Sequence, residues 1–116
     1  MRSLARDVLY HWHGAKDEPA QVLRITFQEF PKSVVLKLEG RIVGPWSDEL
    51  IVAWAEFALS HRVQNMAVDL REVTYMDASG MQVLRQIYRE TKADFLANTP
   101  LTECFANQVQ QLAVSN

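Results

Sequence analysis

Long apolar runs are missing from this sequence of 116 residues. A membrane-spanning helix needs about 18 or more largely apolar residues in a row, and a secretory signal needs an apolar core of about 7–15 residues. Charged side chains interrupt residues 1–7 before such a core can form. We therefore expect a cytoplasmic protein that does not insert into a membrane.

Cysteine and basic charge are also scarce. The single cysteine, Cys104, cannot form an internal disulfide, which fits a reducing compartment. The 12 lysines and arginines are outnumbered by 14 aspartates and glutamates, for a formal net charge of -2. Proteins that bind nucleic acid usually carry a clear basic excess, so nucleic acid is not an expected partner.

Sequence motifs of common enzyme classes are absent. Asp77 stands two residues before Ser79, where the nucleophile elbow of a hydrolase has glycine. There is no phosphate-binding loop and no dinucleotide fingerprint. His11 and His13 are two residues apart, a spacing that does not share a helix face. We expect no enzymatic activity, no metal and no cofactor.

The sequence has the length and composition of one globular domain. Residues 1–20 differ from the rest, because a short amphipathic stretch is followed by a linker-like segment at residues 14–19. We interpret residues 1–20 as an N-terminal extension, with its mobility left open, and residues 21–116 as the domain.

Hydrophobic periodicity predicts the order β-β-α-β-α-β-α. Alternating apolar residues at 23–27 and 34–38 flank a turn at 30–33 and predict an antiparallel hairpin. Ser47 is the expected N-cap of the first helix, which ends near residues 61–62. A short third strand is expected at 66–70, a second helix that opens within 77–80, a fourth strand at 95–97 and a third helix from Pro100. Strands that alternate with helices favour parallel pairing. The expected fold is α/β, with about three helices packed on a mixed sheet of about four strands.

The segment before the second helix holds the most informative polar residues. Asp77 can cap the backbone N–H groups of that helix, and Ser79 then falls in its first turn, beside Gly80. The positive end of a helix favours an anion such as phosphate. On this local pattern alone, simple helix capping remains the alternative to a phosphorylation site.

Residues 73–81 carry a family resemblance. They read Val-Thr, an aromatic, an aliphatic, Asp, a small residue, Ser, Gly and an aliphatic. This pattern resembles the signature of STAS domains, which occur in bacterial anti-sigma-factor antagonists, and the resemblance extends over residues 21–116. It implies a STAS-like fold for the domain.

In anti-sigma-factor antagonists the serine before the glycine accepts a phosphate, which corresponds to Ser79, supported by Asp77, Ala78 and Gly80. The resemblance implies a binding module in partner-switching control of transcription. Its partners would be an anti-sigma factor that is also a serine kinase, and an opposing serine phosphatase. A homodimer is left open. The residues expected to contribute to a partner interface are Gly44, Pro45, Trp46, Ser47, Met81, Gln82 and Arg85.

Other STAS-like single domains are accessory subunits of membrane transporters for lipids or anions and dock on the transporter ATPase. In that alternative, the start of the second helix is a docking contact and phosphorylation plays no part.

Overall fold

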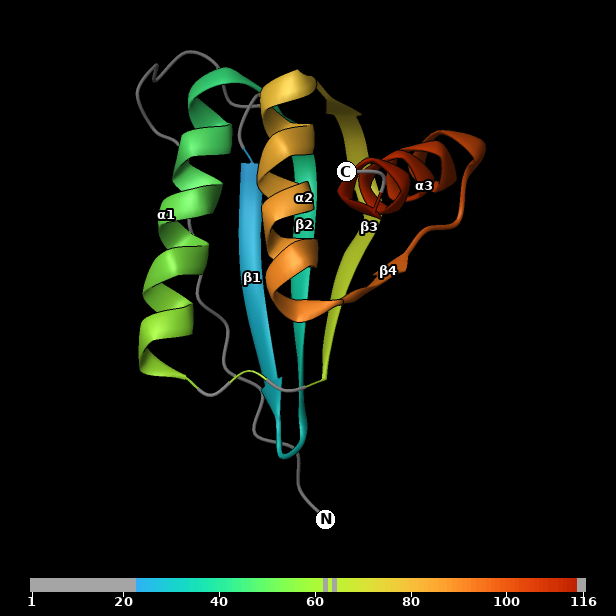
Figure 1. Ribbon diagram of the computed structural model, residues 1–116. Helices are drawn as coiled ribbons and strands as arrows, with labels where there is room; N and C mark the ends of the chain where they lie inside the picture. The colour runs from blue at the N-terminus through green and yellow to red at the C-terminus, as the bar shows by residue number, and fades with distance from the viewer. Residues whose placement is uncertain (1–22, 62, 64, 115–116) are drawn as a thin grey trace.

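The computed structural model describes residues 23–61, 63 and 65–114. These residues form one four-stranded sheet with three helices (Figure 1). The elements are β1 (Leu23–Phe30), β2 (Ser33–Ile42), α1 (Gly44–Ser60), β3 (Met66–Met76), α2 (Ala78–Thr91), β4 (Asp94–Leu96) and α3 (Pro100–Val114). The expected α/β class, the order of elements and the mixed sheet are confirmed.

The strands lie in the order β1-β2-β3-β4. β1 and β2 form the antiparallel hairpin, whereas β2, β3 and β4 run parallel. α1 and α2 lie over one face of the sheet, and α3 lies beside α2 over β3 (Figure 1). Every second residue of β1 and β2 points under the helices, and these alternate residues supply the buried core, including Leu23, Ile25, Phe27, Leu36 and Leu38.

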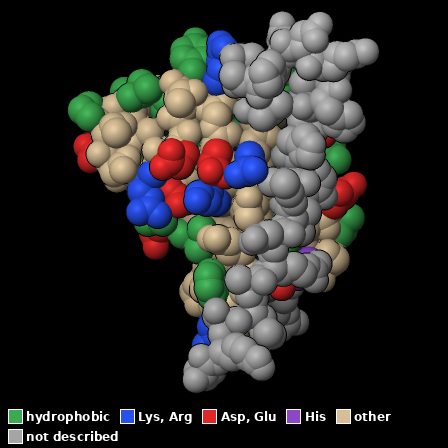
Figure 2. All heavy atoms as spheres, turned by 180° about the vertical axis from the view of Figure 1, so that it is seen from behind, with side chains coloured by type: hydrophobic (Ala, Val, Ile, Leu, Met, Phe, Trp, Pro, Cys, Tyr) green, Lys and Arg blue, Asp and Glu red, His purple; other side chains and the backbone are tan. Residues whose placement is uncertain are grey.

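The opposite face of the sheet carries charged side chains, which gather there in Figure 2. Arg24 and Glu39, which are cross-strand neighbours, approach to 3.8 Å. The carboxylate of Asp69 is only 4% exposed and accepts two hydrogen bonds of 3.0 Å from the Arg71 guanidinium. Burial raises the pKa of Asp69, but the hydrogen bonds from Arg71, together with the positive charges of Arg71 and Lys37, outweigh burial and hold that pKa below its ordinary value.

Among the boundaries that differ from the sequence-based expectation, three lie near the carboxyl ends of β2 and β3. β2 continues beyond Gly40 to Ile42, because the positive φ of Gly40 (108°) accommodates a bulge against β3. β3 was expected to be short but continues to Met76, because its polar second half is hydrogen-bonded to β2. α1 begins at Gly44. Ser47 is therefore inside the helix, and its predicted role as the N-cap is wrong.

The expected extension over residues 1–20, with His11 and His13, lies outside the described residues. In the described part of the chain, no helix combines the length and the apolar character needed to cross a membrane.

Candidate functional site

The candidate site lies where β2 and β3 end and where α1 and α2 begin. Both helices start at the same end of the sheet, at the top of Figure 1. Ligand and partner sites of parallel sheets commonly occur at this end, since the strand-to-helix turns meet there. Residues from two distant segments, 42–47 and 76–81, thereby become neighbours.

Gly80 allows the start of α2 to lie close to the end of β2. A Cβ atom at Gly80 would clash with the carbonyl oxygen of Ile42, and it would lie 2.8 Å from Ile42 Cγ2 and 2.9 Å from Met76 Cγ. The absence of a side chain therefore allows the first turn of α2 to pack directly on the end of β2. This contact fixes the position of Ser79, the preceding residue.

Asp77 is the N-cap of α2, as expected from the sequence. Its Oδ1 accepts a hydrogen bond from the Gly80 amide (3.0 Å), and its Oδ2 accepts one from the Gly44 amide (3.2 Å). The Ser79 hydroxyl donates to Oδ1 at 2.7 Å. The hydrogen bond from the Ser79 hydroxyl is the main reason why the pKa of Asp77 is below its ordinary value. Burial raises this pKa by less, and the hydrogen bonds from the amides of Gly80 and Gly44 lower it further. The carboxylate is thus held in its charged form.

Ser79 is exposed at the second position of α2. Its Oγ lies between the Asp77 carboxylate and the hydroxyl of Ser47, which is 3.0 Å away. A hydroxyl has one hydrogen and two lone pairs. Ser79 Oγ is a donor within reach of two acceptors, the Asp77 carboxylate and the Ser47 hydroxyl, and its one hydrogen serves one of them at a time. An exposed hydroxyl at the positive end of a helix can accept a phosphoryl group.

The remaining expected interface residues divide by exposure. Gly44, Pro45 and Gln82 are exposed, and Trp46 and Arg85 are half-buried. Ser47 (1% exposed) and Met81 (8%) are buried. Little of either side chain is therefore accessible to a partner in this conformation, and their place in an interface stays a prediction. Ala78, next to Ser79, is exposed.

The contact between Ser47 and Ser79 was not predicted from the sequence. The two serines are 32 positions apart, and no local pattern connects them. A signal for the true start of α1 was present, because proline is favoured in the first turn of a helix and Pro45 lies there.

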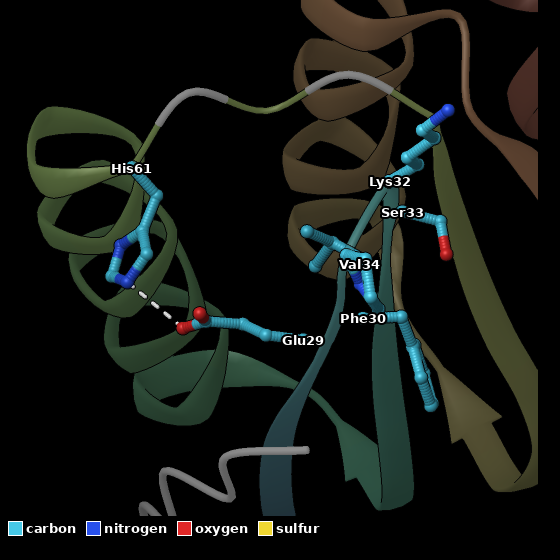
Figure 3. A pocket seen from close by; sticks show the side chains of 7 residues that line it. Glu29, Phe30, Lys32, Ser33, Val34 and His61 are labelled. Carbon is cyan, nitrogen blue, oxygen red and sulfur yellow. Dashed lines mark ion pairs between the residues drawn. The ribbon is translucent and has the colours of Figure 1, made fainter. Parts of the chain in front are cut away.

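A second polar pair lies at the opposite end of α1. His61 Nε2 is 2.8 Å from Glu29 Oε2, an ion pair when the imidazole is protonated (Figure 3). Both residues line an open groove of about 320 Å³ beside the β1–β2 turn. The sequence pattern indicated that the helix ends near His61, but no local pattern indicated a partner for His61 on β1.

Among the described residues, no group of three or more His, Cys, Asp or Glu side chains is arranged to hold a metal ion. The polar groups that the structure brings together around Ser79 are hydroxyls, backbone amides and the Asp77 carboxylate. Such a set can bind an anion or change charge by modification.

Comparisons with known proteins agree with this architecture. The family model for the STAS domain matches residues 23–95, which is more than half of the chain. Among solved structures, the anti-sigma factor antagonist SpoIIAA in its unphosphorylated form is similar, with a TM-score of 0.58 over 77% of this chain and 79% of that chain. The sequence identity is 16%, so this likeness shows the fold alone. A comparison with curated proteins finds no match.

Proposed function

The chain belongs to the STAS domain family, and on that premise we propose that it is a regulatory binding module controlled by phosphorylation of Ser79. The observation that carries the proposal is that Ser79, the serine of the family signature, is an exposed residue at the start of α2. As in anti-sigma-factor antagonists, the unphosphorylated protein binds its partner and the phosphorylated protein is released.

The proposed partners are an anti-sigma factor with serine kinase activity and an opposing serine phosphatase, in partner-switching control of transcription in the bacterial cytoplasm. The kinase uses a nucleoside triphosphate. Ser79 Oγ forms a bond to the γ-phosphorus, the bond from that phosphorus to the leaving nucleoside diphosphate breaks, and the hydroxyl proton passes to a base. Turnover belongs to these partners, and the chain itself acts as substrate and ligand.

Charge explains how this modification changes binding. A phosphate adds about -1.5 to -2 charge and three acceptor oxygens. On a free helix end, the partial positive charge of the N-terminus tolerates it. Within an interface, the phosphate must lose water next to the Asp77 carboxylate, whose low pKa keeps it charged. Desolvation and repulsion therefore oppose the complex more than they oppose the free protein.

The first experiment tests the acceptor. The protein is incubated with the candidate kinase and ATP, and the modified residue is identified by mass spectrometry. Ser79→Ala is expected to abolish labelling, whereas Ser60→Ala, a change at another exposed serine, should leave it intact. Label that remains on the Ser79→Ala variant would remove Ser79 from the mechanism.

The second experiment tests the effect of charge on binding. Ser79→Asp and Ser79→Asn place side chains of the same size at this position, and only one of them is charged. We expect Ser79→Asp to weaken partner binding by at least about 1–2 kcal/mol relative to Ser79→Asn, as measured by calorimetry, while the fold is retained. A stable complex with a transporter ATPase, equally tight with both variants, would instead support the docking role.

A further inference from the structure

Asp77 caps two helices. α1 starts after Val43, which has no side-chain capping hydrogen bond. The first amide of α1, that of Gly44, instead donates to Asp77 Oδ2, 33 positions away in the sequence. The other oxygen of the same carboxylate caps α2 through Gly80. One side chain therefore serves the starts of both helices.

Ser79 lies at the centre of this arrangement. The Ser79 hydroxyl donates a hydrogen bond to Asp77. Its oxygen also lies 3.0 Å from the hydroxyl oxygen of Ser47, a residue near the start of α1. Two hydrogen bonds connect the start of α1 to the start of α2, Gly44 to Asp77 and Ser79 to Ser47, and a third, from Ser79 to Asp77, lies within the start of α2. The last two involve Ser79 Oγ, the atom that phosphorylation would change.

The other attachments of the first turn of α1 are the buried Ser47 (1% exposed) and Trp46, which packs against the edge of the core. Gly44 has a positive φ of 49°, and no atom lies within 4 Å of the place where its Cβ would be. Pro45 is exposed and Trp46 is half-buried. The deeply buried apolar residues of α1 begin later, at Leu50. Gly44 and Pro45, at the very start of the helix, are thus held to the rest of the domain by the hydrogen bond from the Gly44 amide to Asp77.

We propose that phosphorylation of Ser79 removes the Asp77 cap from α1 and so loosens the turn at residues 44–47. This inference rests on the proposed function and adds the means by which the modification acts. Phosphoserine has no Oγ hydrogen to donate to Asp77, and its phosphate is attached to the oxygen that lies 2.7 Å from that carboxylate in the unmodified protein. The phosphate also occupies the positive end of α2. The Asp77 carboxylate is therefore displaced, and the Gly44 amide loses its acceptor.

The displaced turn contains Gly44, Pro45 and Trp46, which the sequence analysis placed in the partner interface. Modification at α2 would therefore change the shape of the adjoining surface on α1. A phosphate that only blocks the interface would leave this turn unchanged, and the two possibilities can be separated without the partner.

The test uses the full chain with phosphoserine incorporated at position 79 during translation, so no kinase is needed. Amide hydrogen exchange is followed by NMR at Gly44 and Trp46, with Leu84 in α2 and Val109 in α3 as internal references. We expect exchange at Gly44 to accelerate about tenfold on phosphorylation, as for the loss of one helix cap, with no change at the references. Equal exchange at Gly44 in the two forms would overturn the proposal.

A double-mutant cycle tests whether the effect passes through Asp77. In unphosphorylated protein, Asp77→Asn should by itself accelerate exchange at Gly44, and phosphoserine should then add little. The matched control is Asp69→Asn, a change at a second carboxylate with a lowered pKa, which should leave the response to phosphorylation intact. If phosphorylation accelerates exchange equally in Asp77→Asn and in the unmutated chain, Asp77 is not the link and the proposal fails.

Failure of this inference differs from failure of the proposed function. Loss of partner binding on phosphorylation, with Gly44 exchange unchanged, would keep the switch and reject the uncapping of α1. Faster exchange at Gly44, in a protein that the kinase does not label at Ser79, would keep the coupling between the helices and reject the switch.

Discussion

The two ends of α1 are held by different kinds of contact. At its start, the Gly44 amide and the Ser47 hydroxyl are joined by hydrogen bonds to Asp77 and Ser79, both near the surface. At its other end, the ring of Phe57 is stacked between Phe27 (4.1 Å between centroids) and His61 (4.0 Å). An acidic side chain contacts the helix at each end: Asp77 accepts from the Gly44 amide at the start, and Glu29 pairs with His61 at the other end.

The start of α1 is therefore a sensitive end, which a chemical change at Ser79 can alter, and the end near His61 is a stable end. Hydrogen bonds to a hydroxyl depend on one proton, and a single covalent change removes them. Stacked rings depend on buried area and shape, which a charge far away does not alter. The helix can therefore respond at its start while its end keeps it on the sheet.

The largest effect is expected at the stable end. Phe57→Ala should lower the free energy of unfolding by about 4 kcal/mol, because it leaves a cavity between Phe27 and His61. Urea denaturation measures the loss. Leu59→Ala, on the same helix but 89% exposed, should change stability by less than about 0.5 kcal/mol. Similar losses in the two variants would contradict the importance of the stack.

The next effect tests the packing of the sensitive end. Gly80→Ala should cost about 3 kcal/mol, because the new Cβ meets the Ile42 backbone and Met76. Gly44→Ala has open space around it and should cost only about 1 kcal/mol, for the positive φ of 49°. Thermal and urea denaturation of both variants give the comparison. An equal cost at the two glycines would mean that α2 can move away from β2.

A smaller and pH-dependent loss of stability is expected when Asp77, which caps both α1 and α2, is replaced. Asp77→Ala should lower the free energy of unfolding by about 1–2 kcal/mol at neutral pH, as for other N-caps. The pKa of Asp77 is lower in the folded protein than in the unfolded chain. Its contribution is therefore fully present above the ordinary carboxyl pKa of about 3.9 and is lost as the pH falls through the folded value.

Denaturation at several pH values measures this dependence. The stability of Asp77→Ala should approach that of the unmutated protein only in acid. A difference that stays constant down to about pH 2 would show that the charge of Asp77 does not stabilise the two helices.

The smallest effect isolates the hydroxyl. Ser79→Ala removes the main cause that lowers the pKa of Asp77, so that pKa should rise toward its ordinary value. A ¹³C NMR titration of the side-chain carboxyl measures the change, and Asp69 in the same spectra should titrate as before. An unchanged Asp77 pKa would mean that the Gly44 and Gly80 amides alone hold the carboxylate.

Sequence patterns predicted the features that depend on local periodicity. Alternation at residues 23–27 indicated β1, and Asp77 was correctly expected to cap α2. The start of α1 was misplaced at Ser47, because serine followed by two acids resembles a local cap. The acceptor at the true start is Asp77, and it is brought there by the parallel pairing of β2 with β3.

The end of β3 could not be predicted from local patterns either. Residues 71–76 are mostly polar or exposed, and an apolar pattern does not include them. Hydrogen bonding to β2 makes them a strand, and that neighbour is visible only in the folded chain. Contacts between distant segments are what the patterns could not predict, and the candidate site consists of such contacts.

Gly80 has a consequence for recognition. The serine–glycine pair looks like a short linear motif that an enzyme reads on the surface, yet the glycine is required by the spacing between α2 and β2. Replacing it to escape a modifying enzyme would damage the fold before it altered the modification. An enzyme that reads this pair therefore relies on a residue that the chain cannot readily give up.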